Sequence, residues 1–297
     1  MFYETEKYTK TKNVLLYVII VIVSVLIIIG SFIVSNYIIV NSKKSNEISK
    51  ENNILDEFSA QHKIIPNHNI ELIKKYMVPI YKESAQSEIK GIYSSNEKQV
   101  FLTFDAGPSP LTPLILDILK EEQVPATFFV VGARVDFYPD IAKREYDEGH
   151  YIANHGYTHN YSQIYTSEQT VLDEYIKCEQ SIKNAIKNQD YNSYFFRYPG
   201  GSSGGKYEKI KNSSKNVLTK NNITFTNWNC LTGDAEGVNT QEGLIAKLAE
   251  TKAHRTSLIV LMHDAGDKQL TVDTLRQIIQ NFKSEGYKFK NFYEIFK

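Results

Sequence analysis

The chain has 297 residues, and its 34 Lys and Arg residues balance its 34 Asp and Glu residues, so the formal net charge is zero. This balance argues against a nucleic-acid-binding protein, which would normally carry an excess of basic residues. Two cysteines, Cys178 and Cys230, are too few for a disulfide framework or a multi-cysteine zinc site. A single bridge between them stays open, although two buried thiols are the simpler interpretation.

Residues 14–40 form a segment without a charged residue, and most of them are Val, Ile or Leu. At ~1.5 Å per residue, a helix of this length spans a bilayer with some tilt. A cleaved signal peptide is the alternative, but the apolar run is long and no small-residue cleavage site follows it. We therefore expect a cytoplasmic tail at 1–13, one uncleaved transmembrane helix at 14–40, an extracellular stalk at 41–95 and a catalytic domain at 96–297.

Short apolar runs alternate with longer amphipathic stretches from about residue 97 onward. The predicted strands are Gln99–Phe104, Ala126–Val131, Tyr151–Ala153, Tyr194–Arg197, Thr224–Asn229 and Leu258–Met262. The predicted helices lie near residues 112–122, 139–148, 167–187, 206–221, 241–254 and 270–286. Alternation over ~200 residues predicts parallel strands joined by right-handed crossovers, in a barrel or a doubly wound sheet.

Chemically active side chains follow five of the predicted strands, at the edge where α/β folds place their active sites. They are Asp105, the pair His155 and His159, Arg197, Asp234 and His263. Each alone has a plainer interpretation, since such residues also cap helices, bind turn amides or form surface ion pairs. Their joint position at successive strand ends predicts one active site.

This set of side chains suits the hydrolysis of an amide or ester. Two neutral imidazoles can hold a divalent cation and leave positions open for water and a substrate oxygen. Such an ion lowers the pKa of bound water and polarises a carbonyl group. A carboxylate can take the proton of the water, another imidazole can protonate a departing amine, and a nearby arginine keeps the carboxylate ionised.

In chain order, the segments resemble the five motifs of the polysaccharide deacetylases, the NodB-homology domain of carbohydrate esterase family 4, from about Val100 to the C-terminus. The resemblance implies a distorted (β/α)7 barrel that removes acetyl groups from N-acetylated sugars. It implies a role for each motif residue: Asp105 as general base, Arg197 as its orienting partner, His263 as general acid, Asp234 as the residue that tunes this acid, and His155 and His159 as metal ligands. The residues expected to contact substrate are Pro199, Gly200, Leu261 and Trp228.

Two positions depart from the family pattern. Ala106 stands where the family usually has a second, metal-binding Asp, and Ala235 stands where a Trp commonly follows the acid of the fourth motif. The expected cofactor is a divalent metal, Zn²⁺ or alternatively Co²⁺, with water or a turned Asp105 filling the gap. Hydrolysis with an altered metal dependence or none, by Asp105 and His263, is a second interpretation. A glycan-binding pseudo-enzyme is a third, although the other catalytic-type residues are all present.

A membrane anchor and a short stalk would hold the domain near the bacterial cell wall, so peptidoglycan is the expected substrate. N-acetylglucosamine is the expected sugar. N-acetylmuramic acid is the alternative, because some relatives acting on it also depart at the second Asp. The expected location is the bacterial cell membrane, crossed once, with the catalytic domain outside and the N-terminal helix as the membrane contact.

Overall fold

The computed structural model describes residues 78–297. The predicted transmembrane helix at 14–40 and most of the predicted stalk lie outside this range. Within residues 78–297, no helix combines the length and apolar character needed to cross a bilayer.

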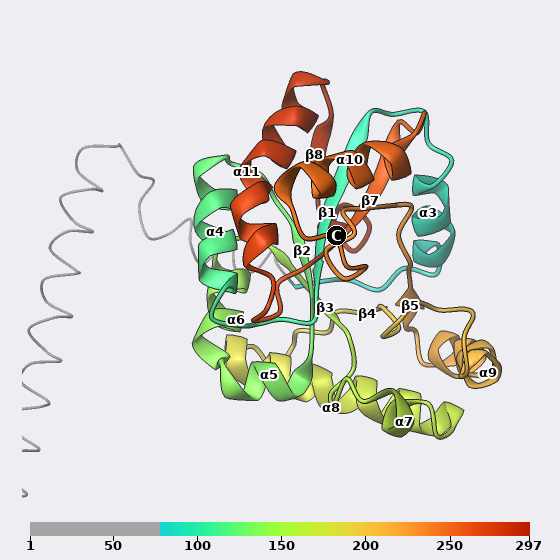
Figure 1. Ribbon diagram of the computed structural model, residues 1–297. Helices are drawn as coiled ribbons and strands as arrows, with labels where there is room; N and C mark the ends of the chain where they lie inside the picture. Colours follow the sequence, from blue (N-terminus) through green and yellow to red (C-terminus); the bar gives the residue numbers. More distant parts are fainter. Residues whose placement is uncertain (1–77) are drawn as a thin grey trace, which may run out of the picture. The chain divides into compact units, whose positions relative to one another are not determined.

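A parallel β-sheet forms the centre of the described region (Figure 1). Its strands are β1 (Gln99–Asp105), β2 (Thr127–Val130), β3 (Tyr151–Asn154), β4 (Phe195–Phe196), β5 (Thr224–Phe225), β6 (Cys230–Leu231), β7 (Ser257–His263) and β8 (Lys288–Lys290). They lie in the order β5-β4-β3-β2-β1-β7-β6, and β8 pairs with the first half of β1. The two end strands, β5 and β6, do not pair with each other in this sheet, so the predicted barrel is a half-barrel whose strands are parallel as expected.

Strand β1 lies between β2 and β7 in the sheet, and all seven of its residues are buried. It pairs along its whole length with β7, and this register sets Asp105 directly beside His263. On its other side, the same Asp105 lies beside Phe129 of β2. Parallel strands in register end at the same edge of a sheet, so the central strands carry their last side chains to one place.

Helices cover the sheet, and all six predicted helices are present with ends shifted by no more than two residues. The helices are α3 (Ala85–Ile92), α4 (Thr112–Glu121), α5 (Gly132–Phe137), α6 (Pro139–Asp147), α7 (Tyr161–Ile164), α8 (Glu168–Ile186), α9 (Glu208–Lys220), α10 (Gln241–Lys252) and α11 (Gln269–Ser284), with a 3₁₀ turn at Phe292–Glu294. The sequence pattern did not predict α3, α5 and α7, which have eight residues or fewer.

Helix α3 lies in the segment assigned from the sequence to the stalk, yet it packs on the domain. Its Ala85, Ile89 and Ile92 are buried in one apolar cluster with Phe101 and residues near the C-terminus. The side chain of Gln86 also accepts from the backbone N–H of Phe225 and donates to its carbonyl, at 3.0 and 3.1 Å. These contacts cover the free edge of β5. The packed domain therefore begins before residue 96.

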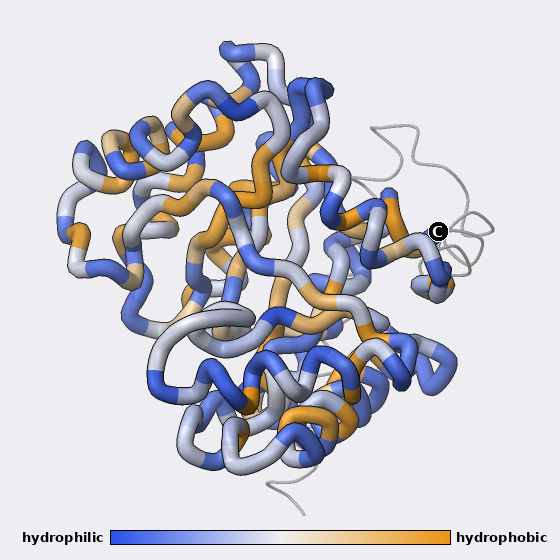
Figure 2. The backbone as a smooth tube through the Cα atoms, turned by 90° about the vertical axis from the view of Figure 1, so that its right-hand side faces the viewer, coloured by the Kyte–Doolittle hydropathy of each residue, from blue (hydrophilic) through white to orange (hydrophobic). Residues whose placement is uncertain are grey.

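The main apolar core lies between the sheet and the helices. Apolar segments follow the central strands, while hydrophilic segments lie mainly along the outer helices and loops (Figure 2). Cys178 and Cys230 are both buried and free, as the simpler interpretation of the two cysteines predicts.

Candidate active site

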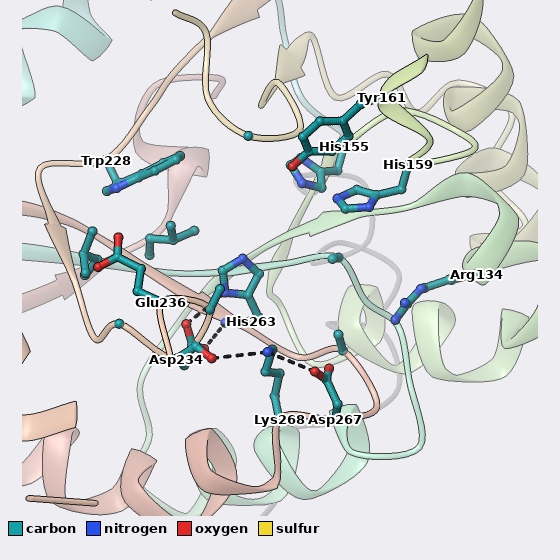
Figure 3. A pocket seen from close by; sticks show the side chains of 17 residues that line it. Arg134, His155, His159, Tyr161, Trp228, Asp234, Glu236, His263, Asp267 and Lys268 are labelled. Atoms are coloured by element: carbon teal, nitrogen blue, oxygen red, sulfur yellow. Dashed lines mark hydrogen bonds and ion pairs between the residues drawn. The ribbon is translucent and has the colours of Figure 1, made fainter. Parts of the chain in front are cut away.

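A cleft of about 390 Å³ lies where the segments that follow the strands β1 to β7 meet, and Figure 3 shows the side chains that line it. His155, His159, Asp234 and His263 all line it, although they come from segments up to about a hundred residues apart. This is the edge at which the sequence predicts an active site. Asp105 lies just beneath the cleft and is 2% exposed.

The predicted base, Asp105, is held by Arg197, which directly follows β4. The Nη1 group of Arg197 donates to Asp105 Oδ1 at 2.8 Å and to Thr103 Oγ1 at 2.7 Å. Its Nη2 group donates to the carbonyl of Asn227 at 3.0 Å, and the guanidinium stacks on the ring of Phe129. Arg197 is completely buried. The carboxylate therefore has one fixed orientation, with Oδ2 left for other partners.

Burial raises the pKa of Asp105, and the positive charges of Arg197 and His263 offset this rise only in part. A base whose pKa is raised from the ordinary value of an aspartate accepts a proton from water more readily. The environment of Asp105 thus suits proton abstraction.

The predicted acid, His263, is bound to Asp234 through both oxygens of the carboxylate. Its Nδ1–H donates to Oδ1 at 2.9 Å, and its backbone N–H donates to Oδ2 at 2.7 Å. Thr271 Oγ1 also donates to Oδ2, at 2.8 Å. Burial alone would lower the pKa of His263, but the hydrogen bond and charge of Asp234, with the charge of Asp105, raise it overall. With Nδ1 engaged, Nε2 is the ring nitrogen left to give up a proton.

The histidine pair lies on the loop after β3. His155 Nδ1 donates to the carbonyl of Arg197 at 2.7 Å, so Nε2 carries the free lone pair and lies 3.9 Å from Asp105 Oδ2. Burial lowers the pKa of His155 well below its ordinary value, and burial lowers that of His159 to about 4. Both rings are therefore neutral near pH 7, as ligands of a metal must be.

A glutamate on α8 holds this loop in place. Glu174 accepts from the backbone N–H groups of Tyr157 and Thr158, both at 2.7 Å, and from Thr158 Oγ1 at 2.9 Å. These hydrogen bonds stabilise the loop although His159 has a positive φ of 54°, which is unfavourable for a residue with a Cβ. Sequence reasoning did not identify Glu174, since nothing local links it to the histidines.

The donor set does not complete a three-ligand metal site. His155 suits a ligand, because its second nitrogen bonds a carbonyl and aims the first. Ala106, however, offers the cleft only a methyl group. No group of three or more His, Cys, Asp or Glu side chains within residues 78–297 is arranged to hold an ion. Catalytic zinc sites usually have three protein ligands, and two imidazoles are one short.

Three of the four residues expected to contact substrate line the cleft: Gly200, Trp228 and Leu261. Pro199 is not among the lining residues, and its carbonyl accepts from the hydroxyl of Tyr165 at 2.6 Å. The structure thus gives Pro199 a contact with a tyrosine rather than with the cleft.

Five charged or aromatic residues line the cleft that sequence reasoning did not identify: Arg134, Tyr161, Glu236, Asp267 and Lys268. Lys268 donates to the carbonyl of Asp234 at 3.2 Å and forms an ion pair with Asp267 at 3.0 Å. Arg134 projects from α5, on the side of the cleft opposite Trp228 (Figure 3). Only Tyr161 had a sequence signal, its position two residues after His159.

Comparison with known proteins gives one consistent group of relatives. A family model described as polysaccharide deacetylase matches residues 93–228. A peptidoglycan-N-acetylglucosamine deacetylase of Bacillus cereus is 28% identical over 278 residues, which cover 92% of each chain. The fold is similar to that of a Streptococcus mutans CE4 esterase, with a TM-score of 0.63 and 31% identity over 72% of this chain and 92% of that one. It is also similar to a CE4 family pseudoenzyme from Bacillus anthracis, with a TM-score of 0.55 and 28% identity over 68% and 66% of the two chains.

Proposed function

The chain belongs to the polysaccharide deacetylases of carbohydrate esterase family 4, and from this premise we propose that it hydrolyses the N-acetyl groups of peptidoglycan, with N-acetylglucosamine as the first-choice sugar. One observation carries the proposal. A buried carboxylate oriented by Arg197 and an imidazole oriented by Asp234 end two neighbouring strands at one cleft. The substrate is supported by the Bacillus cereus relative, whose name specifies peptidoglycan N-acetylglucosamine.

The proposed reaction begins with a water molecule between Asp105 Oδ2 and His155 Nε2, whose separation of 3.9 Å is too long for a direct hydrogen bond. Both atoms accept, so the water donates to each and keeps its lone pairs free. The water oxygen attacks the acetyl carbon as Asp105 takes one proton. His263 Nε2 then protonates the sugar nitrogen, the C–N bond breaks, and acetate and a free amine leave.

The membrane anchor belongs to the same proposal. The uncharged segment at 14–40 would anchor the domain at the outer face of the cell membrane. Peptidoglycan is the glycan polymer that the domain would meet there. This location favours a cell-wall glycan over a plant polysaccharide.

Acetate release from purified peptidoglycan by the full-length chain tests the function. We expect release by the native protein and a loss of at least about 100-fold in kcat for Asp105→Asn and for His263→Ala. Asp117→Asn, at a half-exposed residue on α4, is the matched control and should retain full activity. Defined oligomers of N-acetylglucosamine, and of N-acetylglucosamine alternating with N-acetylmuramic acid, identify the sugar that loses its acetyl group.

A glycan-binding protein without catalysis is the second candidate, favoured by Ala106 and by the pseudoenzyme among the structural relatives. It predicts that the native chain is retained on peptidoglycan but releases no acetate with any added metal. Acetate released only by Ala106→Asp would establish this alternative and overturn the enzymatic one.

A further inference from the structure

Arg134 is a cation that lines the cleft and lies close enough to His159 and Asp267 to act on their charge without contacting either side chain. It is half-buried and lines the cleft together with Ala106, His155 and His159. Within residues 78–297, its side chain makes no hydrogen bond and no ion pair, so all its guanidinium donors are unused. A guanidinium in this state is suited to bind an anionic oxygen of a ligand.

The other nearby cations are already engaged. Lys268 binds Asp267 and the carbonyl of Asp234. Arg197 is buried against Asp105 and Thr103 and does not line the cleft. Among the described residues that line the cleft, Arg134 is therefore the cation whose donors remain for a substrate.

Arg134 lines the same cleft as Ala106, the position at which the family pattern has a metal-binding aspartate. The methyl group of Ala106 offers no ligand for an ion. The guanidinium of Arg134 therefore supplies positive charge and N–H donors to a carbonyl oxygen at this end of the cleft.

We propose that Arg134 takes the place of a metal ion in this cleft by binding the acetyl carbonyl oxygen of the substrate and stabilising the oxyanion that forms there. The inference rests on the proposed deacetylation. As the water oxygen bonds to the acetyl carbon, the carbonyl π electrons move to the oxygen held by Arg134, and Asp105 takes the proton of the water. The oxyanion then re-forms the carbonyl, the C–N bond breaks, and His263 supplies the proton for the leaving amine.

Kinetics of Arg134 variants of the full-length chain test this role. Removing one donor to an oxyanion costs about 10²–10³ in kcat. We expect that loss in Arg134→Gln with little change in KM, partial recovery in Arg134→Lys, and no loss of native activity in the presence of a chelator. Arg276→Gln, at an exposed position on α11, is the matched control. Activity of Arg134→Gln within about threefold of the native chain, or native activity abolished by a chelator, would overturn the inference and leave deacetylation standing.

A binding measurement tests the role of Arg134 without any turnover. It separates this role from the deacetylase function, which a native chain that releases no acetate would refute. The probe is a glucosamine oligomer with an anionic, tetrahedral methylphosphonyl group on nitrogen, compared with the neutral N-acetylated oligomer by calorimetry. We expect the native chain to prefer the anionic probe by at least tenfold and Arg134→Gln to lose only this preference. An equal preference in both chains, or none in the native chain, contradicts the role of Arg134.

Zinc titration gives a third, independent measurement. The native chain should show no stoichiometric Zn²⁺ binding at micromolar concentration, whereas the double variant Ala106→Asp, Arg134→Gln should gain it, because the variant restores a carboxylate ligand and removes the competing cation. Stoichiometric Zn²⁺ binding by the native chain at the same concentration would contradict the proposal that Arg134 takes the place of a metal ion.

Discussion

His263 is bound twice to one carboxylate: its Nδ1–H donates to Asp234 Oδ1 at 2.9 Å and its backbone N–H to Oδ2 at 2.7 Å. The first bond selects the ring tautomer and raises the pKa of His263 against the effect of burial. The second bond fixes the end of strand β7, where His263 lies, relative to the carboxylate of Asp234. Together they keep a proton on the imidazole and direct Nε2 away from Asp234.

Replacing Asp234 by Asn should shift the pH dependence of activity toward lower pH. On the alkaline side of the profile, kcat/KM falls as His263 loses its proton. The carboxylate of Asp234 raises the pKa of His263. Without this charge the pKa falls, so the alkaline limb of the profile moves to lower pH and activity at pH 7 drops about tenfold or more. The measurement is the pH profile of acetate release; an unmoved alkaline limb would show that His263 is not the acid.

Alanine substitutions at Gly200 and Gly204 separate a loss of stability caused by backbone strain from a loss of substrate binding caused by displacing a cleft side chain. Gly200 and Gly204 have similar positive φ angles, 72° and 74°, so an alanine at either should cost about 1 kcal/mol of stability. A Cβ at Gly200 would lie 2.9 Å from the hydroxyl of Tyr161, whereas one at Gly204 has nothing within 4 Å. We expect Gly200→Ala alone to displace Tyr161 and to raise KM several-fold. Thermal melts and Michaelis kinetics of both variants check this, and an equal KM would argue that Tyr161 does not contact substrate.

A buried acid pair should make stability depend on pH. Burial raises the pKa of Glu145 well above its ordinary value, and burial raises that of Asp264 to about 6. Neither oxygen of Glu145 has a hydrogen-bond partner within the described part of the chain. The folded state therefore keeps protons that the unfolded chain has released, so stability falls as pH rises from about 4 through the raised folded-state pKa values.

Glu145→Gln should remove part of this dependence. The penalty is about 1.4 kcal/mol for each pH unit over which the folded carboxyl keeps a proton that the unfolded one has lost. The variant should be more stable than the native chain at pH 8 and nearly equal to it at pH 5, whereas Glu250→Gln, at an exposed position on α10, should change neither value. Urea unfolding at the two pH values measures the difference, and equal stabilities of variant and native chain at pH 8 would refute it.

Local periodicity was sufficient for much of the fold. The six predicted helices and the six predicted strands are all present, because amphipathic helical spacing and short, continuously apolar runs are properties of neighbouring residues. The strands β6 and β8, with two and three residues, were not predicted, and their pairing partners β7 and β1 lie far away in sequence. Helix α3 was missed because its burial depends on β5 and the C-terminal segment, which are far away in sequence.

The sequence by itself determined the six longer helices, six of the strands, their parallel arrangement and the polar residues that end the strands. These follow from the spacing of apolar residues and the chemistry of single positions. Tertiary structure alone decided which of those residues meet. Register sets Asp105 beside His263, the fold directs the carbonyl of Pro199 to Tyr165, and helix α5 brings Arg134 to the cleft beside Ala106. The physical reason is that hydrogen bonding, desolvation and charge act through space, and the relevant distances join segments that the sequence separates.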